Sequence, residues 1–269
     1  MKVAYELRFL RSRFRNGRLC LQAVAEPRPE GAVTRTKHST IKRFAATALG
    51  LLACWAAPAG AWGDKGHAMS ARVAVRALPA DMPAFFRNAV EELAYLCSEP
   101  DRWRDRQRAP ALTALTAADH WMTLENVPPG LPATRYEFVA ATLARKNAAG
   151  RSLTVQDVGA AAYAIAEDAE RLTAGFRLWR QAPEDTPEQR RIKRQIEQNI
   201  IYNAGVLAHW VTDTAQPLHS TIHTNGWNLE FPNPNGFDGK GIHRRFESVY
   251  VGAQINEADF AAKVGPVRP

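Results

Sequence analysis

The sequence predicts an all-α, multi-helix fold with little or no β structure. Strand signals are scarce, whereas apolar residues recur at helical spacing through most of the chain after residue 62. Proline and glycine interrupt these stretches and divide them into separate helices. We therefore expect one helical domain over residues 62–269, preceded by a leader over residues 1–61.

The leader has the three parts of a secretory signal peptide. Lys42 and Arg43 give a basic region, residues 44–57 an apolar run, and Ala59-Gly60-Ala61 a small-residue cleavage site. The run is shorter than the roughly 20 residues that span a membrane, so we expect an exported, periplasmic or secreted protein without a transmembrane segment. The Arg-rich residues 1–39 precede this signal, which suggests that the start of translation is misassigned.

Cleavage after Ala61 makes Trp62 the first residue of the mature chain. Its free α-amino group and carbonyl oxygen, together with the imidazole of His67, are atoms that can chelate a metal ion. A competing motif, Leu51-Leu52-Ala53-Cys54, resembles a lipoprotein cleavage site. Lipidation at Cys54 would leave Trp62 internal and remove the free amine.

The net positive charge of the chain is concentrated in the leader. Residues 1–61 contain 11 of the 35 Lys and Arg residues and 3 of the 27 Asp and Glu residues, which leaves 24 of each sign. The basic excess is therefore no indication of nucleic-acid binding. Because Cys20 and Cys54 also lie in the leader, only Cys97 remains, and stability depends on packing and on any bound metal.

Each expected helix is a stretch of apolar residues at helical spacing that ends near a proline or a glycine. The clearest start is at Thr186, which caps the helix, with Pro187 in the first turn and Gln189 closing a capping box. Asparagine, glycine and proline make residues 225–241 a loop. In chain order we expect helices over residues 68–78, 85–96, 136–146, 155–180, 187–214 and 243–250, with 101–115 as a short helix or loop.

Five histidines of the mature part stand in contexts suited to metal binding. His209 and Asp213 are four residues apart, so an imidazole and a carboxylate share one helix face. His243 and Glu247 repeat this spacing with a glutamate. The remaining candidates are His219 after Gln216-Pro217-Leu218, His120 beside Trp121, His67 near the new terminus, and Asp101 three residues before Arg104.

Each of these motifs has a plain structural alternative. A single His-x-x-x-Asp pair is usually a surface hydrogen bond, and Asp101 with Arg104 is usually a solvated ion pair. His120 is explained equally well as a hydrogen-bonded core histidine. The combination of two imidazole–carboxylate helix pairs with a cleavage site at Trp62 favours a metal centre. His223 is left over as a loop histidine.

Taken together, these motifs resemble the S1/P1 nuclease and zinc-dependent phospholipase C superfamily. The resemblance spans Trp62 to about Tyr250, and residues 209–219 are its most specific part. It implies a mainly helical protein that holds three Zn²⁺ ions in a cleft and hydrolyses phosphodiester bonds. The implied ligands are Asp101, His120, His209 and Asp213 for the first ion, His219, His243 and Glu247 for the second, and Trp62 with His67 for the third, with Asp213 bridging.

The resemblance also implies the other functional residues. We expect Asp101, Arg104 and Asp213 to be catalytic, with Arg104 near the phosphate and Asp105 as a competitor for the place of Asp101. Trp121 and Thr123 are the expected substrate contacts. The protein is expected to be a monomer without a stable protein partner.

The substrate stays open between phospholipid and single-stranded nucleic acid. Glu247, in place of aspartate, resembles the phospholipase branch, and Thr123 stands where the nuclease branch usually has an aspartate that reads a base. Trp121 or Trp227 could instead stack on a base. A further alternative is a non-catalytic zinc-binding relative. Family members usually continue for several helices after the last ligand pair, so residues 248–269 indicate a truncated or compact variant.

Overall fold

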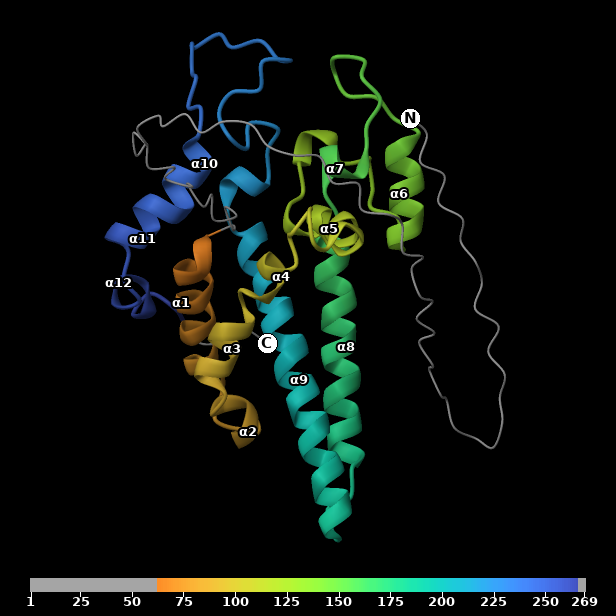
Figure 1. The fold of residues 1–269 in the computed structure, drawn as a ribbon, viewed down its shortest axis with the longest axis vertical. Coiled ribbons are helices and arrows are strands. Elements are labelled where there is room, and N and C mark those ends of the chain that lie inside the picture. The colour runs from red at the N-terminus through yellow and green to blue at the C-terminus, as the bar shows by residue number, and fades with distance from the viewer. Residues whose placement is uncertain (1–61, 266–269) are drawn as a thin grey trace, which may run out of the picture. The chain divides into compact units, whose positions relative to one another are not determined.

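The computed structural model describes residues 62–265 and contains no β-strand in that range, which confirms the predicted all-α fold (Figure 1). The proposed signal peptide, its cleavage site and Cys54 lie outside the described residues. The helices are α1 (Gly63–Arg76), α2 (Ala84–Arg87), α3 (Val90–Leu96), α4 (Glu99–Arg102), α5 (Pro110–Thr116), η1 (Ala117–His120), η2 (Leu124–Asn126), α6 (Arg135–Leu143), α7 (Val155–Val158), α8 (Ala161–Gln181), α9 (Pro187–Thr214), η3 (Pro217–His219), α10 (Ile242–Arg244), η4 (Arg245–Tyr250), α11 (Val251–Gln254) and α12 (Ala258–Ala261).

Helices α8 and α9 form an antiparallel hairpin that carries the largest apolar cluster of the described residues (Figure 1). Burying one large apolar side chain contributes about 1.5–3 kcal/mol to folding. Gly205 lets α9 approach α3 closely, because a Cβ there would lie 2.3 Å from the Cβ of Leu96. The buried side chains of this cluster include Phe86, Leu93, Phe176, Ile196 and Ile200.

The predicted start and end of α9 are confirmed. The Thr186 hydroxyl accepts a hydrogen bond from the Gln189 amide, and the Gln189 side chain accepts one from the Thr186 amide. The helix then continues to Thr214. Residues 196–204 in its middle pack in the apolar cluster, and its last turns carry the buried polar residues His209 and Asp213.

The prediction of one helix over residues 155–180 is wrong. Gly159 separates α7 from α8 with a φ of 82°, and a Cβ there would lie 2.0 Å from the carbonyl oxygen of Trp121. Close contact between two backbones, invisible in the local pattern, breaks the helix. The expected helix over residues 85–96 likewise divides into α2 and α3 around Ala89, which stays in the core.

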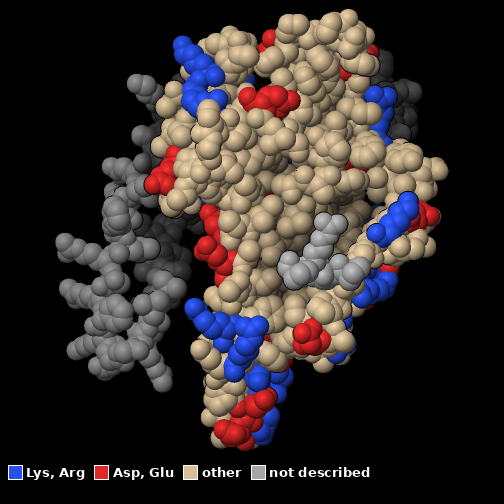
Figure 2. All heavy atoms as spheres, turned by 180° about the vertical axis from the view of Figure 1, so that it is seen from behind, with Lys and Arg blue, Asp and Glu red and all other residues tan. Residues whose placement is uncertain are grey.

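Both signs of charge are mixed on the face that Figure 2 shows. They gather at the far end of the α8–α9 hairpin, where Arg191 pairs with Glu188 and Lys193 with Glu184. This face therefore has no extended basic surface of the kind that tight polynucleotide binding requires. Within residues 62–265, no helix combines the length and the apolar character needed to cross a membrane.

Candidate metal centre

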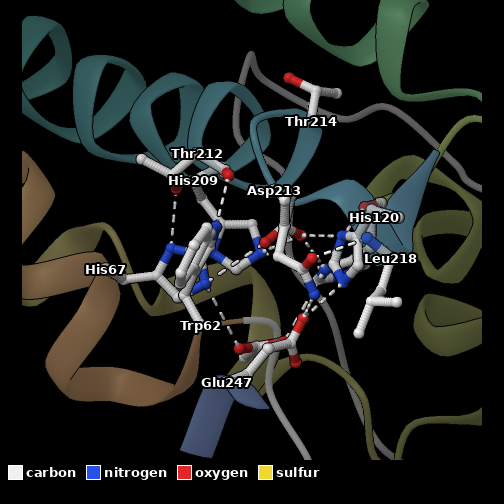
Figure 3. Close-up of polar contacts among 12 residues, drawn as sticks. Trp62, His67, His120, His209, Thr212, Asp213, Thr214, Leu218 and Glu247 are labelled. Carbon is white, nitrogen blue, oxygen red and sulfur yellow. Dashed lines mark hydrogen bonds and ion pairs between the residues drawn. The ribbon is translucent and has the colours of Figure 1, made fainter. Parts of the chain in front are cut away.

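The predicted side-chain ligands converge at the C-terminal end of α9 (Figure 3). His209 and Asp213 lie one turn apart on this helix and are fully buried. The other ligands come from distant parts of the sequence. His67 is on α1, Asp101 on α4, His120 on η1, His219 on η3, His243 on α10 and Glu247 on η4.

The larger set surrounds Asp213 and is called here the Asp213 group; it comprises His67, Asp101, His120, His209 and Asp213. Asp213 Oδ2 lies 2.9 Å from His120 Nδ1 and 3.2 Å from His209 Nε2. Asp213 Oδ1 lies 3.4 Å from His67 Nε2. Two sets of three donors could each hold a metal ion here, namely His67–His209–Asp213 and Asp101–His120–His209.

The second set, the Glu247 group, comprises His219, His243 and Glu247 and could also hold a metal ion. The Nε2 atoms of the two histidines lie 3.2 Å apart. Glu247 Oε1 is 3.2 Å from His219 Nε2, and Oε2 is 2.9 Å from His243 Nε2. Glu247 belongs to a π-helical turn, a distortion that is frequent at functional sites.

Backbone carbonyl groups orient three of the imidazoles. His209 Nδ1 donates to the Cys97 carbonyl at 2.7 Å, and His219 Nδ1 donates to the His120 carbonyl at 2.6 Å. His243 Nδ1 donates to the Thr224 carbonyl at 3.0 Å. A carbonyl only accepts, so each Nδ1 carries a proton and each Nε2 is the ring atom that faces its group. In the Glu247 group the two Nε2 atoms face each other and the carboxylate, to which they donate without a metal ion; deprotonated, they would offer their lone pairs to a shared cation.

Burial controls the ionisation of the Asp213 group. It raises the pKa of Asp213 well above its usual range and that of Asp101 to about 6. It also lowers the pKa of His209 to about 4 and that of His120 well below its usual range. Burial therefore favours the uncharged forms of these acids and bases, and leaves their charged forms in need of a counter-ion.

In the Glu247 group, the carboxyl of Glu247 and the imidazole of His243 favour their charged forms instead. Burial alone would raise the pKa of Glu247, but hydrogen bonds from His219 and His243 outweigh it and lower that pKa to about 2. For His243, burial alone would lower the pKa, but the hydrogen bond to Glu247, the negative charge of Glu247 and the bond to the Thr224 carbonyl together outweigh it and raise the pKa. The two groups therefore contain similar residues in opposite electrostatic states.

Trp62 lies beside the Asp213 group, where its indole Nε1 donates to the Thr212 carbonyl at 2.7 Å (Figure 3). The predicted ligand role of its α-amino group depends on cleavage after Ala61, which lies outside the described residues. The structure places Asp101 rather than Asp105 in the site. Asp105 instead accepts the backbone amides of Gln107 and Arg108.

A cleft of about 330 Å³ adjoins both groups. Trp121 and Thr123, the predicted substrate contacts, line it, and Arg104 lines it with one nitrogen 3.4 Å from Asp101 Oδ1. Trp227 is not part of this lining and stacks on His223 at 3.9 Å between ring centroids. The other polar side chains of the cleft include Asn126, Asn147, Gln156 and Asn228.

Three residues around the ligands had no predicted role. Gln216 is fully buried and its amide donates to Glu247 Oε1. Trp210 packs edge-on against the rings of His120 and His209 and donates to Asp168 at 2.8 Å. Thr212 contacts His67. Their only signal in the sequence is that they lie between or next to the candidate ligands of residues 209–219.

No protein-family model, curated protein or solved structure matches this chain. The arrangement of the candidate ligands in space is therefore the observation that bears on function.

Proposed function

We propose that this protein is a metal-dependent phosphodiester hydrolase that binds three Zn²⁺ ions. The observation that carries the proposal is the convergence of eight buried or half-buried imidazole and carboxylate side chains in two adjoining groups beside one cleft. Ligands of a tetrahedral zinc ion at 2.0–2.1 Å lie about 3.3 Å from one another. The closest donor separations in both groups, 2.9–3.4 Å, are near that value.

The proposed ligands of each ion follow from these groups. Asp101, His120, His209 and Asp213 would hold the first ion. Asp213 would also bridge to the third ion, held by His67 and by the amine and carbonyl of Trp62. The second ion would be held by His219, His243 and Glu247.

The bound ions would supply a water of lowered pKa and positive charge for the attacking and leaving oxygens of a phosphodiester. The chain's own residues position the substrate. Arg104 reaches from the cleft wall toward Asp101, so its guanidinium can neutralise a phosphate oxygen there. The carboxylates of Asp213 and Asp101 hold the imidazoles in position, and burial of these donor atoms excludes bulk water from them.

We favour a phospholipase C-like activity, because a glutamate rather than an aspartate completes the second ligand pair. A single-strand-preferring nuclease is the second candidate, and one observation favours it: Trp121 and four amide side chains line the cleft. An aromatic ring can stack on a base, and amides can bond to its edge.

A paired assay tests both candidates. The purified exported chain is given phosphatidylcholine, with release of phosphorylcholine measured, and single-stranded DNA, with release of nucleotides measured. We expect one substrate to be hydrolysed and EDTA to abolish that activity, with zinc restoring it. Hydrolysis that EDTA leaves untouched would contradict the metal mechanism. A folded, zinc-loaded chain that hydrolyses no phosphodiester would indicate a non-catalytic zinc-binding protein.

A further inference from the structure

We propose, on the basis of the zinc centre proposed above, that Thr212 is a positioning residue that fixes the N-terminal segment Trp62–His67 to the Asp213 group. Thr212 directly precedes Asp213 on α9. It contacts this segment through two atoms, its side-chain hydroxyl and its backbone carbonyl. Figure 3 shows Thr212 on α9 facing His67 and Trp62.

The hydroxyl of Thr212 sets the orientation of His67. Its proton is directed at carbonyls of its own helix, since Oγ1 lies 2.9 Å from the carbonyl oxygens of both Ala208 and His209. The lone pairs of Oγ1 then accept the Nδ1 proton of His67 at 2.8 Å. His67 consequently presents Nε2 to Asp213 Oδ1 at 3.4 Å.

This contact has the role that backbone carbonyls have for three of the other four imidazoles. His209, His219 and His243 each donate Nδ1–H to a main-chain oxygen. In the Asp213 group, His67 Nδ1 has a side-chain hydroxyl in that place at 2.8 Å, well inside the 3.9 Å to Cys97 Sγ, so Thr212→Val removes the nearer acceptor. Partners of this kind hold the tautomer and ring angle of a ligand, and losing one typically costs about 10–100-fold in metal affinity.

The carbonyl of Thr212 holds the start of the segment. Carbonyls in the last turn of a helix have unused acceptor capacity, and the Trp62 indole donates to this one at 2.7 Å. Trp62 has a left-handed backbone with a φ of 51°, and a Cβ on Gly66 would lie 2.8 Å from the Trp62 Cβ. The chain is therefore folded back over the first turn of α1, which brings Trp62 and His67 to the same residue of α9.

The chain offers a matched control for the hydroxyl. Thr214 lies two residues further along α9, and its hydroxyl donates to the Val211 carbonyl at 2.9 Å. In Figure 3 it points away from the ligands. Thr214→Val therefore removes a comparable hydroxyl from the same helix end without touching the Asp213 group.

The test measures zinc per chain and zinc affinity rather than activity alone. Wild type, Thr212→Val, Thr212→Ser and Thr214→Val are produced with the native leader and purified in the exported form. Each is dialysed against a mild chelator and analysed for zinc, and affinities are measured by competition. We expect three ions in wild type, Thr212→Ser and Thr214→Val, and two ions in Thr212→Val, with the third bound about 10–100-fold more weakly.

The outcomes separate this role from the proposed function. Wild type with three ions and Thr212→Val with unchanged affinity would overturn the role of Thr212 alone. Loss of zinc from all groups, or loss of thermal stability in metal-free Thr212→Val, would show a general structural role and also overturn it. A wild-type chain without zinc would end both proposals. Trp62→Phe, which keeps an aromatic ring but removes the indole donor, is expected to weaken binding of the same ion only.

Discussion

The Asp213 group and the Glu247 group contain the same kinds of side chain but differ in how their charge is balanced without an ion. Around Asp213, burial raises the pKa of two carboxyl groups and lowers that of two imidazoles. Around Glu247, the carboxylate is ionised and hydrogen-bonded to two imidazoles. The comparison shows that the types of side chain alone do not decide whether a metal-free group lowers the stability of the fold. The depth of burial and the hydrogen bonds within the group decide this.

A second difference concerns the supports of each group. The Asp213 group is held by α1, α4, η1 and α9, and Trp210 packs against two of its rings. The Glu247 group lies at the cleft, where His243 is half-buried. Substitutions in the two groups should therefore have separable effects.

The largest effect is expected from substituting His209, the donor that the two sets of the Asp213 group share. His209 belongs to both donor sets of that group. His209→Ala should lower phosphodiester hydrolysis by more than the roughly 100-fold that loss of an outer partner causes. His223→Ala is the control, because His223 stacks on Trp227 outside the ligand groups. Steady-state hydrolysis of the preferred substrate measures both, and near-normal rates in His209→Ala would refute the assignment.

Because the carboxyl groups of Asp101 and Glu247 have pKa values shifted in opposite directions, neutralising each of them should change the stability of the metal-free chain in opposite directions. The pKa of Asp101 is raised to about 6 in the folded state, so its ionisation costs stability as the pH rises from about 4 through 6. Two pKa units correspond to about 3 kcal/mol. Asp101→Asn should therefore stabilise the metal-free chain at pH 7 relative to wild type, and the gain should disappear near pH 4.

Glu247→Gln tests the other half of this comparison. The folded pKa of Glu247 is about 2, below its unfolded value, so its contribution is present above about pH 4.5 and is lost as the pH falls through 2. Glu247→Gln should destabilise the metal-free chain at pH 7. Chemical unfolding of both variants and of wild type at pH 4 and 7 measures these effects. The same sign for both variants at pH 7 would contradict the electrostatic difference.

The smallest effect is expected from an outer contact of the Glu247 group. Gln216 donates to Glu247 and accepts from the Leu218 amide at 2.7 Å. Gln216→Met has a similar volume but removes both bonds. It should lower zinc affinity at the Glu247 group by roughly 10-fold and leave the other ions in place. Zinc competition measures the change, and equal weakening of every ion would show that the two groups are not separable.

Several elements could be predicted from local sequence because their causes are local. The capping box at Thr186 and the end of α9 near Thr214 follow from side chains three residues apart and from the proline beyond them. The pairing of His209 with Asp213 follows from the helical repeat. The division of residues 155–180 at Gly159 could not be predicted, since the contact that breaks the helix comes from Trp121.

The sequence by itself determined an all-α chain and the types and spacing of its candidate ligands, because helical periodicity and residue chemistry are properties of neighbouring residues. Tertiary structure alone decided that Asp101, rather than Asp105, faces the imidazoles, and that Thr212 and Gln216 contact the candidate ligands His67 and Glu247. It also gave the two groups their opposite charge states. Those outcomes depend on burial and on contacts between segments more than a hundred residues apart, such as Cys97 with His209, which no local pattern records.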